Sequence, residues 1–314
     1  MRIFPFIAGF SLGIAVFLLG LNLLGQTLTS VLGFRLRALL QRFTANKVSC
    51  LLTGILSTTL VQSSSAVNST MVVLVDSEVL SLRQAFAVML GANIGTTLTV
   101  QIMALPVEKT AFPLIILGLF LFYAAKRPAR GSAVFSLGAV FFGLSFTTKI
   151  LAPILGTAKI QEIVVQLAGT PLRACILGAL LTALVHSSSA VTGLVASLVG
   201  QGSLALPSAV GLALGSNVGT VLTTILASAG RSRASRATAL AELLFNLGGV
   251  LLTLPVYPFF LHLIRLLSRH PSRQVAHAHT IFNLLTALIT MPLLEYLARL
   301  AWVWAGILGG TKNN

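Results

Sequence analysis

Long apolar runs, separated by short polar or basic stretches, set the pattern of this chain. The run from Phe4 to Val31 is long enough to cross the roughly 30 Å hydrocarbon core of a bilayer as one helix. Further spans are expected at Thr110–Ala125, after Ser136, at Ala237–Leu263 and at Ala276–Trp304. The pattern therefore predicts an all-α polytopic membrane protein.

Two apolar runs are too short to span and lead into serine clusters. Val48–Val61 has 14 residues, about 21 Å as a helix. It stops at the polar run from Gln62 to Thr70, and the next apolar arm, Met71–Val75, is shorter still. Two short arms joined at a polar tip predict a re-entrant hairpin. Such a tip is tolerated at membrane depth only where protein or a water-filled cavity surrounds it.

The same arrangement returns 124 residues later without insertion or deletion. Gln62 and the serines after it return as His186 and its serines, and Asn93 between glycines returns as Asn217. We therefore divide the chain into a first repeat (1–130), a second repeat (131–263), and a basic loop with a final span (264–314). A polar motif repeated at fixed spacing is the signature of a duplicated unit.

Glycines interrupt one span in each repeat, at 91–97 and at 215–220. We predict a discontinuous helix at each place, although small residues at every fourth position also suit close helix packing. With a hairpin, each repeat crosses the membrane three times, and an odd count inverts the second repeat relative to the first. Inverted repeats place a binding site at their interface, near the midplane.

Composition agrees with a membrane protein. Of the 314 residues, 56% are hydrophobic and 9% are charged, against about 25% charged in soluble domains. The net charge of +15 does not indicate nucleic acid, because the basic residues lie between apolar runs, where they anchor loops to lipid headgroups. The first apolar run exceeds a signal-peptide core. We expect a retained helix and an integral multi-pass protein of the cell (inner or plasma) membrane.

The two tips would present hydroxyls, side-chain amides and free backbone N–H groups, with no Lys or Arg inside either motif. Half-helices starting at mid-membrane favour negative charge at their N-termini, so a small oxyanion suits the site. Hydroxyls and carbonyls are also hard ligands for Na⁺. Simple hydrogen-bonded bridging between helices is the structural alternative. An enzyme is not expected, because the first serine triplet has no His or acid beside it. No metal cluster or other cofactor is indicated.

These motifs resemble those of the type II sodium/phosphate cotransporter family, over roughly Ser11 to Leu293. The resemblance implies symport of inorganic phosphate with sodium by alternating access. The phosphate-binding residues it implies are Gln62, Ser63, Ser64, Ser65, His186, Ser187, Ser188 and Ser189. The sodium-binding candidates are Ser65, Asn93, Thr96, Thr97, Ser189, Asn217, Thr220, Glu242, Asn246 and Asn283.

Some residues depart from the family pattern. His186 stands where Gln is usual, and Glu242 stands where a His is expected in the motif that His279 keeps. Glu242 is an intramembrane carboxylate, which is costly and functional by default; its alternative is contact with water or Arg236. The C-terminal regulator-like domain of many bacterial relatives is not expected here. Transport of another oxyanion, phosphate export and a non-transporting scaffold remain alternatives, and a homodimer is also compatible with the sequence.

Overall fold

Helices make up every regular element in the part of the chain that the structure, a computed structural model, describes: residues 3–42, 46–105, 107–155 and 157–308. In order, the elements are α1 (Ile3–Arg42), α2 (Lys47–Val61), α3 (Ser64–Asp76), α4 (Leu82–Met103), α5 (Val107–Leu119), the π-helical η1 (Phe120–Ala124), α6 (Pro128–Leu155), α7 (Ala158–Ala168), α8 (Pro171–Val185), α9 (Ser188–Gly200), α10 (Leu206–Ser228), α11 (Arg233–Thr253), the 3₁₀-helical η2 (Leu254–Val256), α12 (Tyr257–Leu267) and α13 (Pro271–Leu308).

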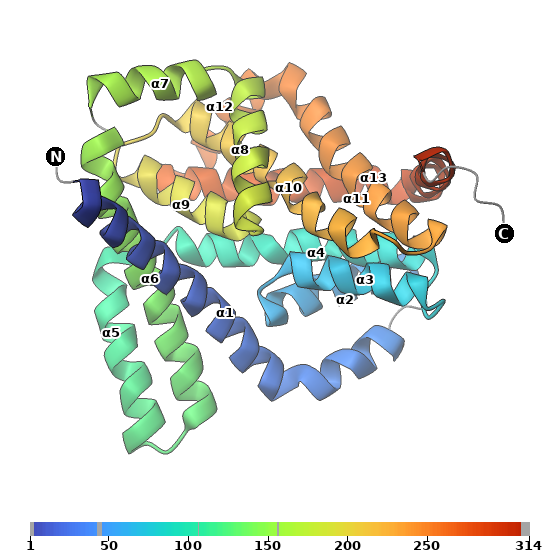
Figure 1. Ribbon diagram of the computed structural model, residues 1–314, viewed down its shortest axis with the longest axis horizontal. Helices are drawn as coiled ribbons and strands as arrows, with labels where there is room; N and C mark the ends of the chain where they lie inside the picture. Colours follow the sequence, from blue (N-terminus) through green and yellow to red (C-terminus); the bar gives the residue numbers. More distant parts are fainter. Residues whose placement is uncertain (1–2, 43–45, 106, 156, 309–314) are drawn as a thin grey trace.

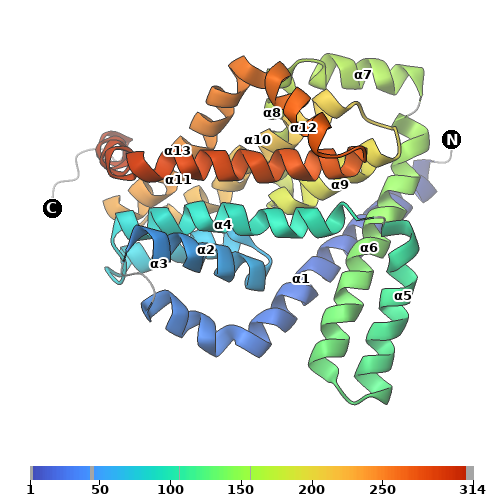
Figure 2. The ribbon, with the colours of Figure 1, turned by 180° about the vertical axis from the view of Figure 1, so that it is seen from behind.

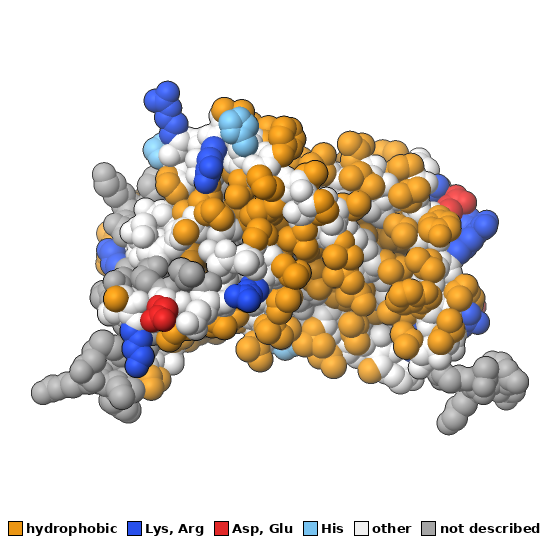
Figure 3. All heavy atoms as spheres, turned by 90° about the horizontal axis from the view of Figure 1, so that it is seen from above, with side chains coloured by type: hydrophobic (Ala, Val, Ile, Leu, Met, Phe, Trp, Pro, Cys, Tyr) orange, Lys and Arg blue, Asp and Glu red, His pale blue; other side chains and the backbone are white. Residues whose placement is uncertain are grey.

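Six stretches of these described residues are long and apolar enough to cross a membrane: Ile7–Leu24, Leu82–Met103, Pro128–Ile150, Leu206–Ser228, Arg233–Leu267 and Pro271–Leu308. Exposed side chains on several of these helices are large and apolar, Leu288 and Ile307 among them. Figure 3 shows such side chains covering much of one face, with Lys and Arg mostly toward its ends. The predicted all-helical membrane protein is confirmed.

The helices form a main body and a smaller outer group. In the outer group α6 packs against both α1 and α5, and the α5–α6 pair projects away from the rest of the molecule (Figure 1). In the main body α4 and α13 run side by side (Figure 2). α2 packs on α4 and α8 on α10, while α3 also reaches α10 and α11, and α9 reaches α13. Both serine-bearing helix pairs therefore belong to the main body.

The polar connection between α2 and α3 is shorter than the sequence predicts. The sequence places a tip at residues 62–70, but α2 ends at Val61 and α3 begins at Ser64. The helix restarts early because the Ser63 hydroxyl accepts a hydrogen bond from the Ala66 N–H, which makes Ser63 an N-cap. Two residues, Gln62 and Ser63, make the whole connection.

The prediction of discontinuous helices is wrong, because α4 and α10 run unbroken through their glycines. These glycines instead allow backbones to touch. A Cβ added at Gly91 would lie 1.9 Å from the Leu51 carbonyl oxygen of α2, and one at Gly215 would lie 1.8 Å from the Cys175 carbonyl oxygen of α8. The small residues therefore hold each short helix pair against its long neighbour.

Two further boundaries differ from the sequence expectation. The basic connection predicted from Arg35 onward is helical as far as Arg42, because the segment is rich in Leu, Arg and Ala, which favour helix. The predicted span Ala237–Leu263 is two helices, α11 and α12, joined through η2. Pro255 in η2 lacks a backbone N–H and disfavours a continuous helix there.

Candidate substrate and ion site

The two helix tips have nearly the same backbone. Gln62 ends α2 with φ 58° and ψ 24°, and His186 ends α8 with φ 58° and ψ 25°. Neither residue is glycine, so both occupy the left-handed region at a cost that the surrounding contacts must offset. Ser63 and Ser187 then cap the following helices, each accepting a hydrogen bond of 3.2 Å from the alanine N–H three residues on. The repeated sequence motif thus codes for a repeated local fold.

The two tips touch each other. The Ser65 hydroxyl of the first tip donates to the His186 carbonyl oxygen of the second at 3.4 Å. Near this contact, α3 and α9 both begin, and the first-turn N–H groups of a helix have no acceptor within it. Ser64, Ser188 and Ser189 are buried, at 6%, 4% and 6% exposure. Hydroxyls and helix N-termini from both halves of the sequence therefore meet at one place.

The first tip is fixed more firmly than the second. Gln62 Nε2 donates to the Thr59 carbonyl oxygen at 2.5 Å, and Gln62 Oε1 accepts from the Thr99 hydroxyl of α4 at 2.7 Å. His186 has an exposed side chain, and its backbone N–H bonds to the Thr182 carbonyl oxygen at 2.7 Å. The two residues share a backbone position but not a side-chain environment.

The asparagines at the predicted helix breaks lie inside continuous helices. Asn93 Nδ2 donates to Asn246 Oδ1 of α11 at 2.9 Å, and both side chains are buried. Asn217 Nδ2 donates to the Ala213 carbonyl oxygen of its own helix at 3.3 Å. The hydroxyls of Thr96, Thr97 and Thr220 likewise donate to carbonyls one turn earlier, which leaves their oxygen lone pairs as acceptors.

Glu242 lies at the centre of a buried polar group on α11. It has 0% exposure, and its Oε1 accepts from Asn68 Nδ2 of α3 at 2.7 Å. Asn246 Nδ2 donates to the Glu242 backbone oxygen at 3.1 Å. Asn283, the remaining predicted sodium ligand, donates instead to the His279 carbonyl oxygen of its own helix, α13, at 2.8 Å. The interpretation that Glu242 reaches water is wrong.

Several polar residues of this interior are not predicted from the sequence. Asn68 lies in the polar run after the first serine triplet, where no local pattern assigns it a role. Thr99, which holds Gln62, and Thr224, which lies beside the Glu242 carboxylate, were also missed. A polar residue within a long apolar helix was the available signal. Their partners lie on helices distant in sequence, which no local pattern identifies.

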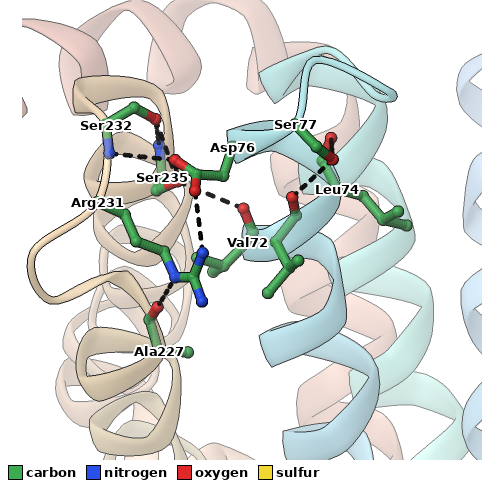
Figure 4. Close-up of polar contacts among 9 residues, drawn as sticks. Val72, Leu74, Asp76, Ser77, Ala227, Arg231, Ser232 and Ser235 are labelled. Atoms are coloured by element: carbon green, nitrogen blue, oxygen red, sulfur yellow. Dashed lines mark hydrogen bonds and ion pairs between the residues drawn. The ribbon is translucent and has the colours of Figure 1, made fainter.

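A second polar cluster ties the outer end of α3 to the start of α11 (Figure 4). The Asp76 carboxylate accepts from the Ser232 N–H at 3.1 Å, from the Ser235 hydroxyl at 2.8 Å and from Arg231 Nη1 at 2.9 Å. Hydrogen bonds from Ser232 and Ser235, with Arg231, hold the pKa of Asp76 well below its usual range. Asp76 thereby stabilises the N-terminus of a helix from the other repeat.

The part of the chain that the structure describes contains six candidate membrane spans, and the chain is an integral multi-pass membrane protein. The sequence model of the Na⁺/Pi-cotransporter family matches it twice, over residues 16–149 and 150–291. The chain therefore belongs to the Na⁺/Pi-cotransporter family, as its motifs predict.

Individual relatives agree with this family. The uncharacterized protein YqeW of Bacillus subtilis is 31% identical over 264 residues, covering 83% of this chain and 86% of YqeW. YjbB of Escherichia coli, whose name proposes export of inorganic phosphate, is 30% identical over 254 residues, covering 80% of this chain and 46% of YjbB. The sodium-dependent phosphate transport protein 2A of Oryctolagus cuniculus is 40% identical over 87 residues, 26% of this chain and 14% of that protein. No solved structure matches the chain significantly.

Proposed function

We propose that this protein carries inorganic phosphate across the membrane together with sodium, and that phosphate binds between the two serine tips. The observation that carries the proposal is the contact between Ser65 of one tip and His186 of the other. It unites two capped helix N-termini and two serine triplets in one place. Family membership and the name of the rabbit relative support phosphate and sodium as the transported species.

The chemistry of the tips suits a small oxyanion. The tips offer serine hydroxyls, the Gln62 amide and first-turn N–H groups of α3 and α9, and no Lys or Arg lies within either motif. Backbone N–H groups and the positive ends of helix dipoles are established ligands of phosphate groups. A site without fixed positive charge binds a phosphate dianion weakly unless a cation enters with it, because an unpaired buried charge is costly. This requirement gives sodium a direct role in coupling.

The candidate sodium ligands at the tips are Ser65 and Ser189, with Asn93, Thr96, Thr97, Asn217 and Thr220 on α4 and α10. The hydroxyls of the threonines keep free lone pairs, as hard oxygen ligands must. Asn246 and Asn283 are candidates on α11 and α13, as the sequence suggested. No other cofactor is needed.

Alternating access follows from the arrangement that we propose for the repeats. If α2–α3 and α8–α9 are re-entrant hairpins, each repeat has an odd number of crossings and the two are inverted. The matched backbone at Gln62 and His186 supports a duplicated unit, and the odd number of crossings is what would invert it. Rocking one half against the other would then open the shared site to either side in turn. A homodimer remains a prediction from the sequence.

The test is uptake of radiolabelled phosphate into proteoliposomes of the purified protein, with and without an inward sodium gradient. Ser64→Ala and Ser188→Ala should each lower uptake by about tenfold or more, since a hydrogen bond to a charged group contributes about 1.5–3 kcal/mol. Ser77→Ala is the matched control, because Ser77 is exposed at the far end of α3 and bonds to the Val73 carbonyl oxygen of its own helix. Near-normal uptake in either tip variant would refute the shared site.

Export of phosphate is the second candidate function, favoured by the similarity to YjbB. The same vesicles loaded with labelled phosphate decide between the two directions. Release driven by an opposing ion gradient, without uptake under the inward sodium gradient, would identify an exporter. An absence of transport in both directions would favour the scaffold alternative.

A further inference from the structure

Three buried oxygen atoms without a hydrogen-bond partner lie around the side chain of Glu242. They are Glu242 Oε2, Asn68 Oδ1 and Thr224 Oγ1. Asn68 donates through its Nδ2 to the other carboxylate oxygen at 2.7 Å, so its Oδ1, on the same carbon, is only a few ångströms away. Thr224 lies close enough to influence the same carboxylate, but not in hydrogen-bonding geometry. Buried polar atoms normally find partners, and these three oxygens are free to accept one.

The group is also short of positive charge. Glu242 has 0% exposure and forms no ion pair with any residue whose position the structure describes. Arg236, six residues earlier on the same helix, forms no ion pair with it, and Arg236 Nε has no hydrogen-bond partner. On the helices packed against α11, Asp76 of α3 pairs with Arg231, and Arg83 of α4 pairs with Glu295 of α13. The other charged or titratable groups of α13 are Arg273, His277, His279, Tyr296 and Arg299. His279 of α13 is buried with neither ring nitrogen bonded.

We propose that Asn68, Thr224 and Glu242 bind a sodium ion in the protein interior, at a site that α3, α10 and α11 build together. This inference deepens the sodium coupling of the proposed function and rests on it. The three ligands are hard oxygens of the kind that Na⁺ binds. One carboxylate matches the charge of one monovalent ion, whereas a calcium site usually has more oxygens and more negative charge.

A sodium ion and a proton would satisfy this group in different ways. A proton on Glu242 Oε2 would remove the charge and could be donated to Asn68 Oδ1, and the Thr224 hydroxyl would then donate to the carboxyl group. A cation can be approached by all three at once, and it also compensates the carboxylate, whose burial alone is costly. A sodium ion therefore differs from a proton in leaving the carboxylate charged while all three oxygens face one centre, and the test below separates the two occupants.

The position of Asn68 connects this ion to phosphate. Asn68 follows Ser64 by four residues on α3, so the two side chains lie on one face of the helix, one turn apart. An ion that joins α3 to α10 and α11 would fix the first serine tip against the second repeat.

The test measures sodium binding with no phosphate present. Purified protein in detergent is titrated with NaCl against choline chloride at constant ionic strength, and thermal unfolding gives the half-saturating sodium concentration. Glu242→Gln keeps the size of the side chain and removes its charge, and should raise that concentration about tenfold or more, because ligand charge sets the affinity of oxygen sites. Thr224→Val keeps the shape, and should raise it by a smaller factor.

The control is Glu295→Gln, an exposed carboxylate paired with Lys47 at 3.0 Å, which should leave the half-saturating concentration unchanged. Ser188→Ala, which lowers phosphate uptake, should keep the sodium response, so failure of the phosphate site is distinguishable from failure of this one. An unchanged sodium response in Glu242→Gln overturns the proposal, as does a wild-type protein stabilised by acid but not by sodium. If Glu242→Gln does not fold, an unchanged response in Thr224→Val overturns it equally.

Discussion

The contact between α8 and α10 gives the sharpest prediction about how the tips are held. A Cβ at Gly215 would lie 1.8 Å from the Cys175 carbonyl oxygen, and real Cβ atoms are essentially never closer than 3.0 Å. In Gly215→Ala the distance between the new Cβ and the Cys175 carbonyl oxygen must therefore increase from 1.8 Å to at least 3.0 Å. The neighbouring atom belongs to helix backbone, which cannot rotate aside. Overpacking of this kind costs about 1–3 kcal/mol. The better helix propensity of alanine offsets at most about 1 kcal/mol of that cost.

The measurement is the melting temperature of the purified variant in detergent, beside phosphate uptake in vesicles. A net cost near 1–2 kcal/mol should lower the melting temperature by several degrees, at about 2–4 °C per kcal/mol for a chain of 150–250 residues. Uptake should also fall, because α8 leads directly into His186. Gly248→Ala is the matched control, since its Cβ would meet nothing within 4 Å. If both variants melt at or above the wild-type temperature, the glycine is not a close-packing residue and the reasoning fails.

Two other contacts give predictions of their own. Asn93→Ala leaves the buried Asn246 Oδ1 without its donor, which should destabilise the protein by about 1–3 kcal/mol; in a double-mutant cycle with Asn246→Ala, fully additive costs would contradict that contact. Because the folded pKa of Asp76 is lowered, its contribution to stability is present above the unfolded pKa of about 3.9 and is lost as pH falls through the folded pKa. Asp76→Asn should therefore lower the melting temperature at pH 7, with a smaller difference from wild type at pH 3; an equal difference at both would exclude the carboxylate as the cause.

The sequence predicted where the two helix tips lie, though not how short they are, because their position depends on local information. A left-handed residue followed by a serine N-cap needs only neighbouring residues, and the second copy at His186 repeats every step of the first. The long spans at Phe4–Val31, after Ser136 and at Ala276–Trp304 were also predictable from hydrophobicity. What failed was the interpretation of Gly91 and Gly215, because a small residue suits both a helix break and a close helix contact. Only the neighbouring helix decides between the two.

The proposed ion site could not have been predicted as a whole. Glu242 was identified as an unusual intramembrane acid, but its partners Asn68 and Thr224 come from two other helices. The predicted partner Asn283 bonds instead within its own helix. Contacts between residues so distant in sequence depend on how helices cross, and a single sequence does not state those crossings.

The long sequence separation of these bonds has a consequence for how the protein is made. Asp76 is synthesised about 155 residues before its partners Arg231 and Ser232. At ordinary synthesis rates this separation corresponds to a delay of roughly 8–30 s. The delay between the synthesis of Asn68 and that of its partner Glu242 is longer still. During that interval the newly inserted first half holds polar groups in the membrane whose final partners do not yet exist. The nascent chain is therefore most exposed to misassembly and proteolysis between the insertion of α3 and that of α11.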